Sequence, residues 1–179
     1  MSSPSHDEHE ALCRRCGMSC HFAVPVNGLA VVIDELRCKF LGKADDGRFH
    51  CTVYERRFEV APWCHTAESA LAAGLLAQDC PYARGTSGYR GKVRLSPSLL
   101  RSVRPAIRAE VLRVGAPIGA DPEAVVKLLA DAGGEWTYAT SEDGSRHVFR
   151  RSDAADAEST SDPTSDPESP RRSPSLRVL

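Results

Sequence analysis

All seven cysteines of this 179-residue chain lie before residue 81, and three of them fall within eight residues near its start. The triplet is Cys13-Arg-Arg-Cys16-Gly-Met-Ser-Cys20, and the later cysteines are Cys38, Cys51, Cys64 and Cys80. An odd number of thiols fits a disulfide framework poorly, and closely spaced cysteines in a reducing compartment more often bind metal. We therefore expect the first half of the chain to be held together by chemistry that the second half does not use.

The overall charge and hydropathy pattern of the chain exclude some classes of protein. A formal net charge of -1 gives no global attraction to nucleic acid or to an anionic membrane. No run approaches the ~18 apolar residues that a membrane-spanning helix needs. Residues 1–10 lack the basic start and apolar core of a secretory signal. We therefore expect a cytoplasmic protein without a membrane segment.

Local patterns in the first half predict short, irregular elements. Gly28-Leu-Ala-Val-Val-Ile33 is a β-branched run that predicts a strand, and residues 49–54 predict a second one. Residues 66–78 predict a helix that Thr66 caps and that Asp79-Cys-Pro81 ends.

The second half has stronger periodicity. Pro97 opens a helical pattern that runs to Val114, and Pro105 is expected to kink or split it. A second helix is predicted from Asp121 to Gly133. Residues 136–140 and 146–150 flank Asp143-Gly144 and predict a β-hairpin with a loop of about five residues.

These elements together predict an α+β chain. The expected order is a disordered lead-in at 1–11, a small irregular cysteine-cluster domain at 12–94 stapled by metal, a helix–helix–β-hairpin unit at 95–150, and a disordered acidic, Ser- and Pro-rich tail at 151–179. The helix–helix–hairpin unit is expected to pack on the cysteine-cluster domain or to be loosely joined to it.

The cysteine spacing indicates a metal site. In Cys13-x2-Cys16-Gly17 the turn lets two sulfurs face one ion, and Cys20 lies one short step further on. Ligands from distant segments must complete the shell, so all seven cysteines are candidate metal ligands. Seven thiolates and one imidazole from His21, His50 or His65 would serve two tetrahedral zinc ions, whereas four thiolates would serve one iron–sulfur cluster. The pattern thus predicts zinc or iron without selecting between them.

Each candidate has a simpler explanation beside it. A single later cysteine is often just a small buried hydrophobe, and a histidine next to a cysteine is more often not a ligand. The metal interpretation requires the thiols to meet in space, and it fails if Cys13, Cys16 and Cys20 face solvent out of reach of the later ones. No nucleophile elbow, Walker loop, dinucleotide glycine pattern or HExxH helix occurs, so we assign no catalytic residue.

The order of these motifs resembles the YkgJ-type cysteine-cluster family, described as a zinc- or iron-chelating CxxCxxCC domain. The resemblance covers roughly residues 12 to 92. It rests on Cys13-x2-Cys16-Gly17-x2-Cys20, Cys38-x-Phe-Leu, Cys51-Thr-Val-Tyr54-Glu-Arg-Arg57, Pro62-x-Cys64 and Asp79-Cys80-Pro-Tyr82-Ala. Where the family has a double cysteine, this chain has Ser19-Cys20. The resemblance implies metal binding, with either a histidine in place of the missing thiol or one weaker site.

A basic segment offers a different function. Between Arg84 and Arg113 the chain has eight basic residues and one acidic residue, Glu110. Arg101, Arg104 and Arg108 would share a helix face that can follow a phosphate backbone, although a solvated face explains the same pattern better.

The leading hypothesis is a metal-binding module that acts in binding or regulation. The alternatives are an iron–sulfur redox or methyl-transfer accessory protein, and a nucleic-acid binder with structural zinc.

Overall fold

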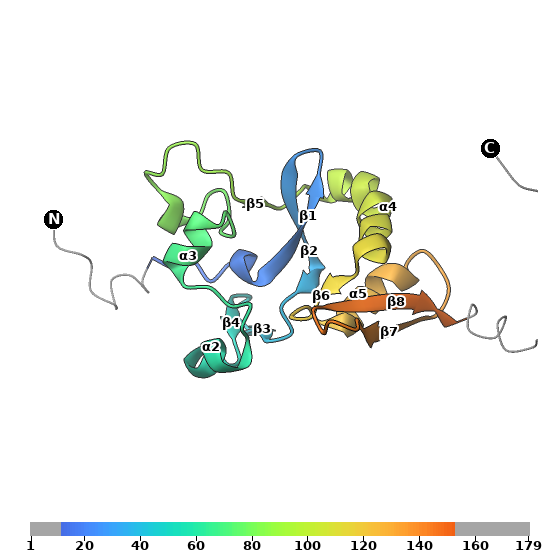
Figure 1. Cartoon of the computed structure of the whole chain (residues 1–179). Helices are drawn as coiled ribbons and strands as arrows, with labels where there is room; N and C mark the ends of the chain where they lie inside the picture. Colours follow the sequence, from blue (N-terminus) through green and yellow to red (C-terminus); the bar gives the residue numbers. More distant parts are fainter. Residues whose placement is uncertain (1–11, 153–179) are drawn as a thin grey trace, which may run out of the picture.

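The computed structural model describes residues 12–152, which form a mixed α+β fold with three small sheets and four α-helices (Figure 1). The α+β class predicted from the sequence is confirmed. The predicted lead-in at 1–11 and nearly all of the predicted tail at 151–179 lie outside the described residues. Among residues 12–152, no helix combines the length and the apolar character that crossing a bilayer requires.

The first sheet has the order β1-β2-β5. Strands β1 (His21–Val26) and β2 (Leu29–Arg37) form an antiparallel hairpin, and β5 (Lys92–Val93) pairs in parallel with β2. Asn27 and Gly28 have φ values of 49° and 79°, which suit the tight turn between twisted strands. The strand predicted at 28–33 is confirmed and extends to Arg37, whereas β1 and β5 were not predicted.

Strand β2 faces two different cores. Val31 and Ile33 point toward helices α4 (Pro97–Val114) and α5 (Pro122–Ala130), while Val32, on the opposite face, packs with Met18 and Ala77. The larger core is formed by Val24, Val31, Ile33, Leu36, Ile107, Val111, Ala116, Ala120, Val125, Leu128, Leu129 and Phe149. It draws on both sides of residue 94, so the helical unit packs on β1 and β2. The division into domains at that residue stays a prediction.

The helices and the hairpin of the second half follow the predicted order. Helix α4 runs without a break through Pro105, so of the two predicted effects of this proline the split does not occur. Its buried residues Ile107 and Val111 keep helical spacing beyond the proline, and their burial outweighs the lost hydrogen bond. Strands β7 (Trp136–Thr140) and β8 (Arg146–Arg151) form the predicted hairpin, and β6 (Ala116–Pro117) completes a sheet of order β6-β8-β7.

The cysteine-bearing segments form shorter elements on the other side of β1 and β2 (Figure 1). These are the 3-10 helix η1 (Met18–Cys20), strands β3 (Leu41–Lys43) and β4 (Phe49–Cys51), the 3-10 helix η2 (Tyr54–Arg56), helices α2 (Arg57–Val60) and α3 (Ala67–Ala72), and the 3-10 helix η3 (Pro81–Ala83). The strand predicted at 49–54 ends at Cys51.

The helix predicted at 66–78 begins correctly and ends early. The Thr66 side chain accepts a hydrogen bond from the Ser69 amide at 3.1 Å, as expected of a helix cap. Helix α3 stops at Ala72, because Gly74 adopts a left-handed backbone with φ 69°. The chain then runs beside β5, where the Lys92 amide donates to the Leu76 carbonyl at 2.8 Å.

The arginines of α4 have partners within the protein. Arg104 pairs with Glu35 of β2 and with Asp131 at 2.9 Å, and Arg108 Nε donates to the Leu128 carbonyl at 2.8 Å. Both side chains are largely covered, whereas Arg101 is exposed. The predicted solvated face is therefore wrong for Arg104 and Arg108, which join α4 to β2 and to the end of α5.

Candidate metal centre

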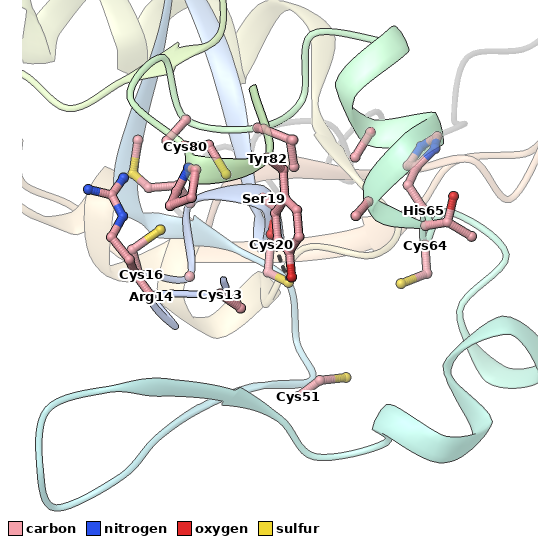
Figure 2. Close-up of a pocket in the computed structure, with 18 of the residues that line it drawn as sticks. Cys13, Arg14, Cys16, Ser19, Cys20, Cys51, Cys64, His65, Cys80 and Tyr82 are labelled. Carbon is pink, nitrogen blue, oxygen red and sulfur yellow. Dashed lines mark hydrogen bonds between the residues drawn. The ribbon is translucent and has the colours of Figure 1, made fainter. Parts of the chain in front are cut away.

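Six of the seven cysteines line one pocket of about 480 Å³ (Figure 2). They come from the segment before β1, from the end of β4, from the segment before α3 and from the start of η3. The six are Cys13, Cys16, Cys20, Cys51, Cys64 and Cys80. Cysteines that are far apart in the sequence thus face a common space.

The thiols face this space without converging on a single point. All seven cysteines are free, with Cys13 and Cys16 exposed and the remaining five half-buried. Within residues 12–152, no three Cys, His, Asp or Glu side chains lie close enough together to hold one metal ion. Any metal would therefore have to draw the side chains, and the loops that carry them, inward.

The turn after Cys16 depends on a glycine. Gly17 has a φ of 70°, and a Cβ at that position would lie 2.8 Å from Cγ of Phe49. The same turn is tied to β4 by a hydrogen bond from the Phe49 amide to the Arg15 carbonyl at 2.9 Å. The glycine in the Cys-x2-Cys-Gly pattern therefore lets the triplet lie close against the strand that carries Cys51.

Arg14 joins the start of the triplet to the segment that carries Cys80. Its guanidinium donates to the Asp79 carboxylate at 3.0 Å and to the Asp79 carbonyl at 2.8 Å. Figure 2 shows Cys16 and Cys80 on the same side of the pocket as Arg14. Two chain segments separated by sixty-five positions are thus held together at their cysteines.

A second group of contacts surrounds Cys20. The Cys38 amide donates to the Cys20 carbonyl at 2.7 Å, and Cys51 lies opposite Leu41 in the β3–β4 ladder. The Thr52 amide donates to the Phe40 carbonyl at 2.9 Å. Cys38 does not line the pocket, but these bonds hold its backbone beside that of Cys20 and close to the strand pair that carries Cys51.

The pKa values of the thiols reflect the same neighbours. The pKa of Cys20 is raised to about 11, mainly by burial and to a smaller extent by the charges of Cys38, Cys64 and Cys51. Burial also raises the pKa of Cys64, with contributions from Cys51 and Cys38. The pKa of Cys80 is raised by burial and then by the charges of Cys16 and Cys13. A cation that neutralised these thiolates would relieve their mutual repulsion.

Behind Cys20 lies a buried lysine that the sequence analysis did not single out. Lys92 is 4% exposed, and its ammonium donates to the carbonyls of His21 at 2.6 Å, Ser19 at 3.0 Å and Met18 at 3.4 Å. Burial lowers its pKa to about 8, and the charge of Cys20 opposes that change. Within residues 12–152 it forms no ion pair with a carboxylate. A buried cation of this kind favours an anionic group in front of it.

The three candidate histidines differ in their position. His21 is buried, does not line the pocket, and has its Nδ1 2.8 Å from the Gly17 carbonyl oxygen. His50 is exposed and also lies outside the pocket. His65 lines the pocket next to Cys64, with its Nδ1 3.5 Å from Ser69 Oγ. His65 is therefore the histidine best placed to supply an imidazole.

Tyr54 and Arg57 form part of the pocket wall. The Arg57 guanidinium lies 3.9 Å from the centre of the Tyr54 ring and donates to the Tyr54 carbonyl at 2.8 Å. This contact stiffens the short turn between β4 and α2.

The pocket offers the thiols of six cysteines as soft ligands. Thiolates prefer zinc, iron–sulfur clusters and other soft metals over magnesium or calcium. Comparison with known protein families, with curated proteins and with solved structures finds no match to this chain.

Proposed function

We propose that this protein binds zinc or iron through its cysteine thiolates and acts as a binding or regulatory module. The observation that carries the proposal is the shared pocket, which is lined by six cysteines from separate segments. Thiols from separate segments that face one pocket can act together as ligands, and thiolates are ligands for these metals. The resemblance to the YkgJ-type cysteine-cluster family agrees with this function, and we include membership of that family in the proposal.

The surroundings of the pocket support an anionic metal–thiolate centre. Four thiolates around a divalent ion leave a net negative charge, and the Lys92 ammonium lies behind Cys20 without a carboxylate partner within the described residues. In the absence of metal, the Cys20 thiol, with a pKa of about 11, is neutral near pH 7. Metal binding would therefore release protons and draw the loops of the pocket together.

Elemental analysis of the full chain, purified without oxygen, tests the proposal. We expect stoichiometric zinc or iron, and hydrogen-exchange protection around Cys16, Cys51 and Cys80 that a chelator removes. Cys51→Ser should lower the metal content. His50→Ala is the matched control, because His50 is adjacent in sequence but lies outside the pocket. Protein that takes up neither zinc nor ferrous iron, with unchanged protection, would contradict metal binding.

The same preparation distinguishes the iron–sulfur alternative. A brown protein with charge-transfer absorbance would identify a cluster, and colourless protein carrying zinc would exclude it. The nucleic-acid alternative has less support, because Arg104 and Arg108 of the basic helix are engaged with Asp131 and the Leu128 carbonyl.

A further inference from the structure

A second pocket lies beside the one that the cysteines line. Its volume is about 760 Å³, within the range of about 300–1,000 Å³ that is usual for small-molecule sites. Arg14, Cys16 and Met18 line both pockets, so the two share a wall. The remaining lining comes from residues 78–79, between α3 and η3, and from residues 92–94, which include β5. Three segments that are distant in sequence therefore meet around this space.

The lining of the second pocket is rich in positive charge. Arg14, Lys92 and Arg94 all belong to it, and Asp79 is its one acidic residue. The whole chain has a net charge of -1, so this excess of cations is local. An anion in the pocket meets three cations and one carboxylate, which favours an anion that carries more than one charge.

The two arginines keep donors for a ligand. Arg14 uses Nη1 and Nη2 on the carboxylate and the carbonyl of Asp79, and Arg94 uses Nη1 on the Asp34 carboxylate at 2.6 Å. A guanidinium has five N–H donors, so each arginine has further N–H groups to donate. The Arg14 and Arg94 side chains are 46% and 42% exposed, so a ligand can reach them from solution.

Lys92 provides a fixed positive charge at the base of the pocket. Its side chain is buried, and three carbonyls hold its ammonium, so it contributes charge and not hydrogen bonds to a ligand. Salt screens a buried charge much less than an exposed one. The ammonium therefore attracts an anion in the pocket without direct contact.

We propose that this second pocket binds phosphate, either free or as the phosphate group of a small ligand. Phosphate carries a charge of about -1.5 to -2 at pH 7, and guanidinium groups bind its oxygens through paired hydrogen bonds. Arg14 and Arg94 donate to the phosphate oxygens, while Met18 and Val93 give the rest of a small ligand an apolar wall. The inference does not depend on the proposed metal binding, because none of these contacts involves a metal.

Titration of the reduced full chain with inorganic phosphate at constant ionic strength tests the proposal, with backbone amide NMR shifts as the readout. We expect saturable shifts at residues 78–79 and 92–94. Glucose 6-phosphate, compared with glucose, distinguishes the two sources of phosphate. Tighter binding of glucose 6-phosphate than of inorganic phosphate would support a phosphorylated small ligand, and equal binding would support free phosphate.

Three variants locate the site. Arg94→Met should weaken phosphate binding about tenfold, the usual value of one charge-assisted hydrogen bond. Arg90→Met is the matched control, because Arg90 is an exposed arginine nearby in sequence that does not line the pocket. Asp79→Asn removes the one carboxylate of the lining and should strengthen binding about two- to fivefold. A purely structural role of Asp79 predicts no such gain.

The contrary results are distinct. Equal losses in Arg94→Met and Arg90→Met would indicate general attraction to a basic surface and would overturn the site. Unsaturable or absent shifts with both inorganic phosphate and glucose 6-phosphate would also overturn it, while leaving the proposed metal binding untouched. If Arg94→Met fails to fold, Asp79→Asn decides the question, and unchanged or weaker phosphate binding by that variant counts against the proposal.

Discussion

The two faces of β2 are stabilised in different ways. On the face that holds Val31 and Ile33, twelve buried residues form one core with α4, α5 and β8. On the face that holds Val32, the buried cluster has three residues, and Cys80 is packed at its edge. Small apolar clusters rarely stabilise a fold alone, and metals or disulfides commonly supply the difference. The cysteine side therefore has much less apolar burial to stabilise it than the helical side, and the proposed metal would contribute most there.

The largest expected effect lies on the helical side. Leu128→Ala removes a fully buried side chain from the main core, and we expect a loss of about 2–5 kcal/mol in the free energy of unfolding. Chemical denaturation measures the loss. Because the change is remote from the pocket, the folded variant should keep the metal content of the unaltered protein.

Leu99→Ala is the matched control, since Leu99 is a leucine of α4 that is 56% exposed. It should change the free energy of unfolding by much less than Leu128→Ala. A folded Leu128→Ala protein that had lost its metal would show that the two faces of β2 are not held independently.

The second expected effect concerns the cysteine side. Lys92→Met keeps the length of the side chain but leaves the carbonyls of Ser19 and His21 without their donor. We expect a loss of about 1–3 kcal/mol in the free energy of unfolding, the usual cost of unsatisfied buried groups. Metal affinity should also fall, because the positive charge behind Cys20 is gone. Denaturation and zinc competition with a chelator measure the two changes.

Lys127→Met controls for the loss of a lysine, because Lys127 is exposed on α5. It should leave both quantities nearly unchanged. If Lys92→Met lowers stability but leaves metal affinity as it was, Lys92 acts on the backbone alone and the charge argument is wrong.

The two faces of β2 also differ in how well the sequence predicts the elements that pack on them. Helix α5 has apolar residues at helical spacing and a clear start and end, so the sequence predicts its buried face. The β7–β8 hairpin was predicted from two short strand patterns on either side of Asp143-Gly144. Strand β1 had a signal in Asn27-Gly28, a typical hairpin turn that joins it to β2. The predicted helix at 66–78 ended early because one glycine at position 74 adopts a left-handed backbone.

The sequence predicted which residues form the candidate site, but not how those residues are arranged in space. The cysteine spacing indicated which residues to examine, and six of them do line one pocket. Their arrangement around the pocket depends on the Arg14–Asp79 contact and on the Cys38–Cys20 hydrogen bond, which join segments that are distant in sequence. Lys92 carried no signal at all, because an isolated lysine is normally exposed and only the fold directs three carbonyls toward it.

The smallest expected effect tests the contact between the helical side and β2. Arg104 of α4 pairs with Glu35 and Asp131, and Arg104→Met removes both pairs while keeping an unbranched side chain. Such pairs near a surface are worth about 0.2–1 kcal/mol each, so we expect a loss of about 1 kcal/mol in the free energy of unfolding. Arg101→Met, on the exposed part of the same helix, should cost much less. Retention of both variants on duplex or single-stranded nucleic acid at low salt provides the second measurement. If Arg104→Met costs nothing in stability but weakens such binding, the arginine would be a phosphate ligand, and the basic helix would have the function that its internal ion pairs now argue against.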